Sequence, residues 1–239
     1  MPDKPPENLS APGFFGKLRS HGDFVGRRLS PAMRAPLDAW LQAALLRSQA
    51  DLGATWLPVW LTSPLWRFVL APGVCGSQAW AGVMMPSLDR VGRCFPLVLA
   101  APLTGAPLLA DCLTRHAAWF VRLEEIALSS LDDGFALEAF DAALLALAGA
   151  PSARLGPALQ AGRGALGEMA GNPAARALVT PLSAAAGPAL RAMDGASAWW
   201  GTGSAQVASS LAQCRGLPAP ALFSAMLDGA WRARGWQLG

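Results

Sequence analysis

Three short apolar segments between residues 66 and 101 constrain the fold of this 239-residue chain most strongly. Residues 66–71, 78–85 and 95–101 are each bounded by glycine or proline, which is typical of strands. About nine residues separate the second segment from the third, whereas a parallel connection needs a crossover of a dozen or more. The segments therefore predict antiparallel pairing and argue against a purely parallel, doubly wound sheet.

One amphipathic helix is expected over residues 31–52, ahead of these strands. The hydroxyl of Ser30 can accept a hydrogen bond from an unpaired amide of the first turn, and Pro31 at the first helical position loses no bond. Gly53 is suited to a left-handed cap at the other end. The apolar positions that follow helical spacing are Leu37, Trp40, Leu41, Ala44, Leu45 and Leu52.

The remaining elements are expected on both sides of this central part. A first strand is predicted at residues 13–18, followed by a polar loop that runs through Arg28. Residues 150–195 are rich in alanine, glycine and proline, and their helical pattern has poorly determined boundaries. The other predicted elements are helices over 108–131, 135–148, 205–214 and 219–232, and a late strand over 196–200.

Strands from both ends of the chain, with helices between them, predict an α/β fold. We expect a three-layer sandwich with a mixed, largely antiparallel central sheet and helices on both faces. Residues 1–12 contain four prolines and few apolar anchors, which favours a flexible lead segment. Residues 13–239 are expected to form a single domain, because one core of this size is ordinary.

Composition favours a cytoplasmic protein. Although 53% of the residues are hydrophobic, no stretch reaches the roughly 18 consecutive apolar residues of a membrane span. The first residues are polar and proline-rich, unlike a secretory signal. The four cysteines are widely spaced and show no metal-ligand spacing, so we expect reduced thiols.

The net charge is distributed unevenly. Residues 1–100 carry ten Lys and Arg against six Asp and Glu (+4), whereas residues 101–239 carry nine against ten (−1). Only 15% of all residues are charged, and the basic residues are interspersed with Asp23 and Asp89 instead of forming a continuous stripe. This pattern argues against a nucleic-acid-binding surface.

The usual catalytic patterns are incomplete. Gly13, Gly16 and Lys17 resemble part of a phosphate-binding loop, but Leu18 stands where such a loop needs serine or threonine. The chain has two histidines, His21 and His116, and no Gly-x-Ser-x-Gly turn that would present a nucleophile. We therefore expect no enzymatic activity, no catalytic residue, no cofactor and no metal site.

Polar residues gather instead at the ends of the predicted strands. If those ends converge, two carboxylates and several guanidinium groups can form a hydrogen-bonded network. Such a network could hold loops in place or could form a binding surface, and the sequence leaves both interpretations open. Together with three tryptophans, the candidate residues are Lys17, Asp23, Arg27, Ser63, Trp66, Arg67, Ser87, Asp89, Arg90, Arg93, Trp199 and Trp200.

Ten tryptophans and no tyrosine give the chain an unusual aromatic balance. Most of them fall on predicted core faces. Trp199 and Trp200 are adjacent in the predicted late strand and must point to opposite faces of the sheet. We expect one of the two to be buried, which would leave the other at the surface as an anchor for a partner.

Three motifs follow one another along the first hundred residues. Residues 13–24 read GFFGKLRSHGDF, residues 62–68 read TSPLWRF, and residues 82–96 read GVMMPSLDRVGRCFP. In this order they resemble motifs of the TagF (ImpM) family of type VI secretion-associated proteins. The late segments 197–200 and 216–218 also resemble family segments. Two departures are Arg19, where proline is usual, and Cys94, where an aromatic residue is common.

The resemblance implies a cytoplasmic protein that restrains type VI secretion after translation. It also implies a protein partner, a forkhead-associated scaffold protein of that system, and it brings no catalytic residues. We therefore expect an interaction protein, with no nucleic-acid partner and no membrane insertion. The alternative hypothesis is a sensor of small molecules or nucleotides that uses the same basic strand ends.

Overall fold

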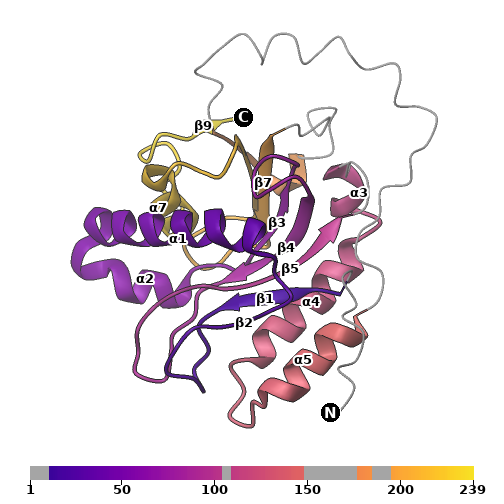
Figure 1. Ribbon diagram of the computed structural model, residues 1–239. Helices are drawn as coiled ribbons and strands as arrows, with labels where there is room; N and C mark the ends of the chain where they lie inside the picture. The colour runs from indigo at the N-terminus through magenta and orange to yellow at the C-terminus, as the bar shows by residue number, and fades with distance from the viewer. Residues whose placement is uncertain (1–10, 104–108, 148–176, 185–194) are drawn as a thin grey trace, which may run out of the picture.

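A computed structural model describes residues 11–103, 109–147, 177–184 and 195–239, which form a nine-stranded sheet between two layers of helices (Figure 1). The strand order is β2-β1-β5-β4-β3-β7-β8-β6-β9. Neighbouring strands are antiparallel except for β6 and β9, which are parallel. The strands are β1 Gly13–Gly16, β2 Val25–Arg27, β3 Trp66–Leu70, β4 Ala79–Met85, β5 Leu97–Leu103, β6 Leu178–Pro181, β7 Ala196–Gly201, β8 Ser210–Arg215 and β9 Gln237–Leu238.

Each face of the sheet has its own apolar core. One core lies under α1 (Pro31–Leu52), α2 (Trp56–Thr62) and α7 (Pro220–Asp228). The other lies under α3 (Leu109–Leu113), α4 (Ala117–Ser129) and α5 (Leu137–Ala146). The predicted three-layer α/β sandwich with a mixed, largely antiparallel sheet is therefore confirmed.

The elements predicted between residues 13 and 103 agree closely with the structure. Helix α1 has the predicted bounds, and the Ser30 hydroxyl accepts a hydrogen bond from the Met33 amide at 3.3 Å. Strand β4 pairs antiparallel with both β3 and β5, as the short connections require. One detail of α1 differs, because Gly53 has a positive φ of 53° but a ψ of −128°, which is not left-handed helical.

Two segments between the main elements differ from the expected loop and helix. Residues 25–27 form the edge strand β2 instead of continuing a loop, because they pair with β1. The expected helix over 108–131 is two helices, α3 and α4. Between them the Thr114 hydroxyl donates to the Ala110 carbonyl at 2.7 Å, a local bond that competes with continued helix geometry. Helix α2 had no counterpart in the sequence prediction.

The helix predicted over residues 205–214 is wrong. Ser204 does not cap a helix there. Its backbone amide and hydroxyl both bond to Val207 and close a turn, after which β8 pairs with β7. Leu211 and Ala212 enter opposite cores, so the sheet overrides the local helical preference. A strand, β6, also lies within the region 150–195, whose residues 150–176 and 185–194 are outside the described part.

Trp199 and Trp200 point to opposite faces of β7 as predicted, but neither reaches the surface. Trp199 is 0% exposed and packs against Trp40 and Phe68. Trp200 is 2% exposed and packs edge-on against Phe120 of α4. The expected surface anchor is therefore wrong, because helices cover the sheet on both sides.

The four cysteines are free thiols, as expected. Cys75 and Cys112 are buried, and burial raises their pKa values to about 11 and about 12. In the described ranges, no helix combines the length and hydropathy of a membrane span. The predicted flexible lead falls largely on residues 1–10, outside the described part.

Candidate functional site

Asp89 is the centre of a buried polar cluster at one end of the sheet. Its residue exposure is 2%. One carboxylate oxygen accepts hydrogen bonds from Lys17 Nζ at 2.8 Å and Arg93 Nε at 2.6 Å. The other accepts the backbone amides of Val91 at 3.0 Å and Arg93 at 2.9 Å. We call the group formed by Lys17, Ser87, Asp89 and Arg93 the Asp89 hub.

The hub is built by the tight loop that joins β4 to β5. Leu88 and Cys94 form an isolated antiparallel bridge, and the Asp89 amide donates to the Arg93 carbonyl at 3.0 Å. Gly92 closes the turn with a φ of 84°, which a residue with a side chain rarely adopts. The backbone amides that bond to Asp89 therefore belong to the same loop. This is why the sequence of the loop alone could indicate a polar network around Asp89 and Arg93.

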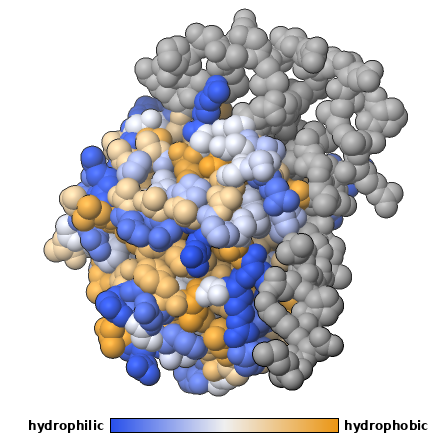
Figure 2. Space-filling model, viewed as in Figure 1, coloured by the Kyte–Doolittle hydropathy of each residue, from blue (hydrophilic) through white to orange (hydrophobic). Residues whose placement is uncertain are grey.

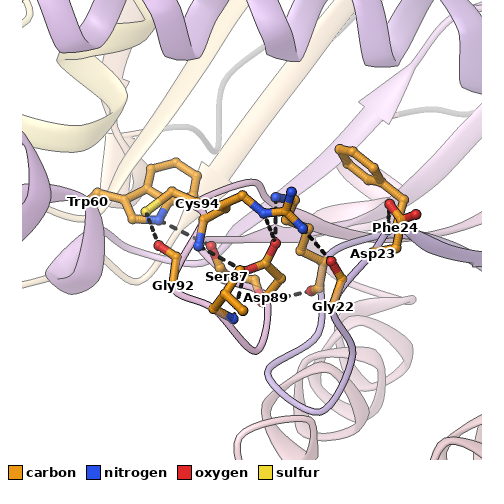
Figure 3. A network of polar contacts seen from close by, with 11 residues as sticks. Gly22, Asp23, Phe24, Trp60, Ser87, Asp89, Gly92 and Cys94 are labelled. Carbon is orange, nitrogen blue, oxygen red and sulfur yellow. Dashed lines mark hydrogen bonds and ion pairs between the residues drawn. The ribbon is translucent and has the colours of Figure 1, made fainter.

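The hub also fastens a second loop, residues 17–24, to the first. The Ser87 hydroxyl donates to the Lys17 carbonyl at 2.8 Å, and the Arg90 amide donates to the His21 carbonyl at 2.8 Å. The Arg93 guanidinium also donates to the Gly22 carbonyl. Figure 3 shows the side chain and backbone groups of both loops converging on the Asp89 carboxylate.

The hydrogen bonds keep Asp89 ionised despite its burial. Burial alone would raise the pKa of the carboxyl group, but the bonds from Lys17, Arg93 and the Val91 amide outweigh it and hold the pKa well below its usual range. An ionised carboxylate has about four acceptor positions, and all four are used inside the cluster. Asp89 is therefore a structural residue, and it has no acceptor position left for a substrate or metal.

The two loops present a mixed cationic and apolar surface. Arg19, Arg90 and Arg93 are exposed, and the Arg93 side chain is 62% accessible. Phe24 is 44% exposed, and Val91 at the tip of the hairpin is 68% exposed. We call these five residues the two-loop surface. Residues 17–24 and 86–96 together carry four basic and two acidic side chains, a net charge of 4 − 2 = +2.

Phe24 is held firmly at this surface. Its ring stacks on Phe15 at a centroid distance of 5.4 Å and meets Phe95 edge-on at 4.8 Å. The Lys17 ammonium lies 5.3 Å from the Phe24 ring centroid, within the range of a cation–π contact. A large side chain that is fixed before binding loses little entropy when a partner covers it.

Three predicted members of the polar network lie elsewhere. Asp23 is exposed, and its carboxylate accepts the amide of the next residue at 2.7 Å, to one side of the hub in Figure 3. Arg27 pairs with Glu138 and Asp141 of α5 at 2.6 and 2.5 Å. Arg67 pairs with Glu124 of α4 through two bonds of 2.8 and 2.6 Å.

Ser63 and Trp66 are structural residues near the hub. The Ser63 hydroxyl donates to the Trp60 carbonyl at 2.9 Å and ends α2. The Trp66 indole donates to the Met226 carbonyl at 3.1 Å and ties β3 to α7. Residues that the sequence analysis overlooked include Trp60, whose indole donates to the Ser87 carbonyl at 3.3 Å. No local pattern marked Trp60, because its partner lies 27 positions away.

A small apolar indentation lies next to the hub, between α2, α7 and the end of the sheet. It is lined by Trp60 of α2 and by Ser63 directly after this helix, by Pro86 and Pro96 at the base of the hairpin, and by Leu227 of α7, among others. Its volume of about 10 Å³ leaves room for about one water molecule and is far below the roughly 300–1,000 Å³ of typical small-molecule sites. No group of three or more His, Cys, Asp or Glu residues in the described ranges is placed to hold a metal ion.

Acid should destabilise the protein through its paired carboxylates. The pKa of Asp89 is held low as described, and bonds from Arg28 and Arg27 likewise lower the pKa of Asp141 against the opposing effect of burial. A carboxyl group with a lowered folded pKa stabilises the fold above its unfolded pKa of about 3.9, and this contribution is lost as the pH falls through the folded value. We expect the urea midpoint to be similar at pH 7 and pH 5 and to drop below about pH 4. A midpoint unchanged down to pH 3 would contradict this assignment of the ion pairs.

Comparison with known proteins adds independent information. Residues 13–147 match a family described as the TagF N-terminal domain, type VI secretion system-associated. The crystal structure of PA0076 from Pseudomonas aeruginosa PAO1 is similar, with a TM-score of 0.74 and 40% sequence identity over 92% of this chain and 94% of that chain. The search of curated proteins gave no match. The matched family region contains the Asp89 hub and all of the two-loop surface.

Proposed function

This chain belongs to the TagF family of type VI secretion system-associated proteins, and from this premise we propose that it is a non-enzymatic regulator that restrains type VI secretion after translation. We further propose that it acts in the cytoplasm by binding a forkhead-associated scaffold protein of the secretion system. Membership of the family supports an accessory role in type VI secretion.

The observation that carries the proposal is the construction of the two-loop surface. The Asp89 hub uses every acceptor of its carboxylate, with the Arg93 guanidinium among the donors, to fix two loops, and the Arg90 side chain is exposed in the same loops as Phe24 and Val91. Exposed guanidinium groups recognise carboxylates through two parallel hydrogen bonds. Arginine and aromatic residues are also enriched among the residues that dominate protein interfaces. This arrangement supports recognition of an acidic protein surface.

Arg67 lies outside the proposed binding surface, although the sequence left open whether it belongs to a structural network or to such a surface. Its guanidinium is engaged by Glu124, and its side chain is 13% exposed. Arg27 is likewise committed to α5. The proposed binding surface therefore includes fewer residues than the charged positions predicted at the strand ends. It consists of the two-loop surface alone.

Charge reversal at Arg90 should relieve repression. The Arg90 side chain is exposed beside Gly22, so Arg90→Glu should leave the fold intact and oppose an acidic partner. We expect a strain with Arg90→Glu on the chromosome to secrete type VI substrates at the level of a deletion strain, while the variant accumulates normally. Secreted substrate in culture supernatants is the measurement.

Arg122→Glu is the matched control, because it makes the same charge change at an exposed position of α4. That strain should secrete like the wild type. Unchanged repression in the Arg90→Glu strain, with normal accumulation of the protein, would show that the two-loop surface is not the binding surface.

A further inference from the structure

A cluster of charged residues joins the short edge strand β2 to helix α5. One oxygen of the Asp141 carboxylate accepts a hydrogen bond from Arg27 Nη1 at 2.5 Å. The other oxygen lies 2.5 Å from Arg28 Nη2, in an ion pair without hydrogen-bond geometry. Glu138 of the same helix accepts two further hydrogen bonds from Arg27, at 2.6 and 3.0 Å. We call these four residues the α5 clamp, because one helix holds the last residue of β2 and the residue after it.

The α5 clamp holds a segment of backbone that needs support. Arg28 has a positive φ of 62°, a conformation that a non-glycine residue keeps only where its surroundings hold it there. Its Nε donates to the Pro12 carbonyl at 3.0 Å. A Cβ atom at Gly13 would lie 2.5 Å from the Arg27 carbonyl oxygen, so the chain at the end of β2 runs directly against β1. The clamp therefore fixes the path of the chain where it leaves β2.

Strand β2 depends on few side chains for its position. It has three residues and lies at one end of the strand order, next to β1. Figure 1 shows β2 at the lower edge of the sheet, near α5. The middle residue is Gly26, which has no side chain, so Val25 and Arg27 are the side chains that can anchor the strand. Val25 packs against the core under α3, α4 and α5, and Arg27 supplies the polar anchor on the same side.

Phe24 faces the other side of the sheet. Side chains alternate along a strand, so Phe24 points away from the face on which Val25 meets the α5 side. Its ring stacks on Phe15, which belongs to the core under α1, α2 and α7. The Asp89 hub holds the loop that leads to Phe24 through backbone carbonyls of that loop. The loop is thus held by the hub at one end and, through β2, by the α5 clamp at the other.

The position of Phe24 matters because it is the exposed aromatic residue of the two-loop surface. Figure 2 shows hydrophobic and hydrophilic residues side by side in the lower part of the molecule, where β1, β2 and α5 lie in Figure 1. A partner that pairs with Arg90 can also cover an apolar ring in the same loops. Aromatic residues are enriched in protein interfaces, and the packing there is as close as in protein interiors. A displaced ring would therefore fit the partner less well.

We infer that Asp141 is a positioning residue for the two-loop surface. Through Arg27 and Arg28 it holds β2, and β2 keeps the Phe24 ring in the orientation in which a partner meets it. Asp141 is 7% exposed, so it acts through β2 and not by contact with the partner. The inference rests on the proposed function and deepens it, because it assigns control of the binding surface to a helix that lies outside that surface.

Asp141→Asn tests the inference, because asparagine has the same size but lacks the charge that holds two guanidinium groups. We expect the dissociation constant for the forkhead-associated protein of the same organism's type VI secretion system to rise at least about fivefold. In a Phe24→Ala background the same substitution should raise it no further, since Asp141 acts through Phe24. The matched control is Asp133→Asn, the same change at an exposed position before α5, which should bind like the wild type.

Hydrogen exchange measured by mass spectrometry tests the clamp without a partner. Local opening of β2 in Asp141→Asn should speed exchange in residues 24–28 and leave exchange in residues 86–96 unchanged. A loss of global stability alone would not single out residues 24–28. Unchanged exchange in that segment would show that Asp141 does not hold β2 and would overturn the inference.

The binding outcomes separate this inference from the proposed function. If the wild type binds and Arg90→Glu weakens binding while Asp141→Asn binds normally, the two-loop surface stands and the positioning role is wrong. Losses that simply add in the Asp141→Asn/Phe24→Ala double variant would also overturn the positioning role. If the wild type does not bind, the proposed partner fails and this inference fails with it. Should Asp141→Asn not fold, Glu138→Gln removes a partner of Arg27 whose side chain is 81% exposed, and it carries the same expectation with a smaller shift.

Discussion

Replacing Trp199 with alanine should lower the free energy of unfolding by about 3–5 kcal/mol, the usual cost of removing a buried aromatic side chain. Trp199 is fully buried between Trp40 and Phe68, at centroid distances of 5.3 and 5.0 Å. Its indole also donates to the Ser197 hydroxyl at 3.0 Å, and that hydroxyl would lose a partner. Strand β7, which carries Trp199, pairs with β3 on one side and with β8 on the other, so the backbone beside the cavity is held by hydrogen bonds on both sides.

Urea denaturation of the wild type and of Trp199→Ala measures this loss. Trp199→Phe is the control, because it retains an aromatic ring and removes the N–H group, and it should lose less stability than Trp199→Ala. A Trp199→Ala protein that unfolds at the wild-type urea concentration would contradict the packing described for β7.

Replacing Lys17 with methionine should lower the thermal midpoint by roughly 10 °C, since it removes the buried partner of the Asp89 carboxylate and leaves the solvent-exposed Arg93 as its remaining cation. The Lys17 side chain is 8% exposed, and its ammonium bonds to a carboxylate that is 0% exposed. The hairpin should also loosen, because the same cluster holds the two loops together. Hydrogen exchange at the amide of Arg90, which donates to the His21 carbonyl, reports on that contact directly.

Arg93→Met is the matched control for Lys17→Met. Arg93 bonds to the same carboxylate oxygen, but its side chain is 62% exposed, so its pairing is weakened by solvent. We expect a smaller change in the thermal midpoint for Arg93→Met. Equal losses in the two variants would show that burial of Lys17 does not determine the strength of the hub.

The parts of the structure that were predictable from sequence are those fixed by local geometry. Ser30 and Pro31 start α1 through contacts within its first turn, and the eleven residues between β4 and β5 leave room only for an antiparallel connection. The Asp89 hub was predictable in part for the same reason, since Asp89 and Arg93 lie in one tight loop. Asp89 and Arg93 also lie in one of the motifs that resemble the TagF family, residues 82–96.

The predictions failed where the local structure or the ion-pair partner depends on residues far away in the sequence. Residues 205–214 have helical spacing, but pairing with β7 makes residues 210–215 a strand. Arg27 finds its partner Glu138 at a separation of 111 residues, and Arg67 finds Glu124 at 57. Sequence spacing gives no information about such partners, so Arg27 and Arg67 were grouped with Asp89 although they pair with residues of α5 and α4. Helix α2 was not predicted because its seven residues are too few to show a clear helical period.

The most direct test of the central claim is calorimetric titration of the forkhead-associated protein into the purified wild-type chain and into Arg90→Glu. The proposal predicts saturable binding by the wild type that weakens as salt is added, because salt screens exposed charges. It predicts a dissociation constant at least about tenfold higher for Arg90→Glu, a difference of about 1.4 kcal/mol. Equal affinities for the two proteins, or no binding by the wild type, would contradict it.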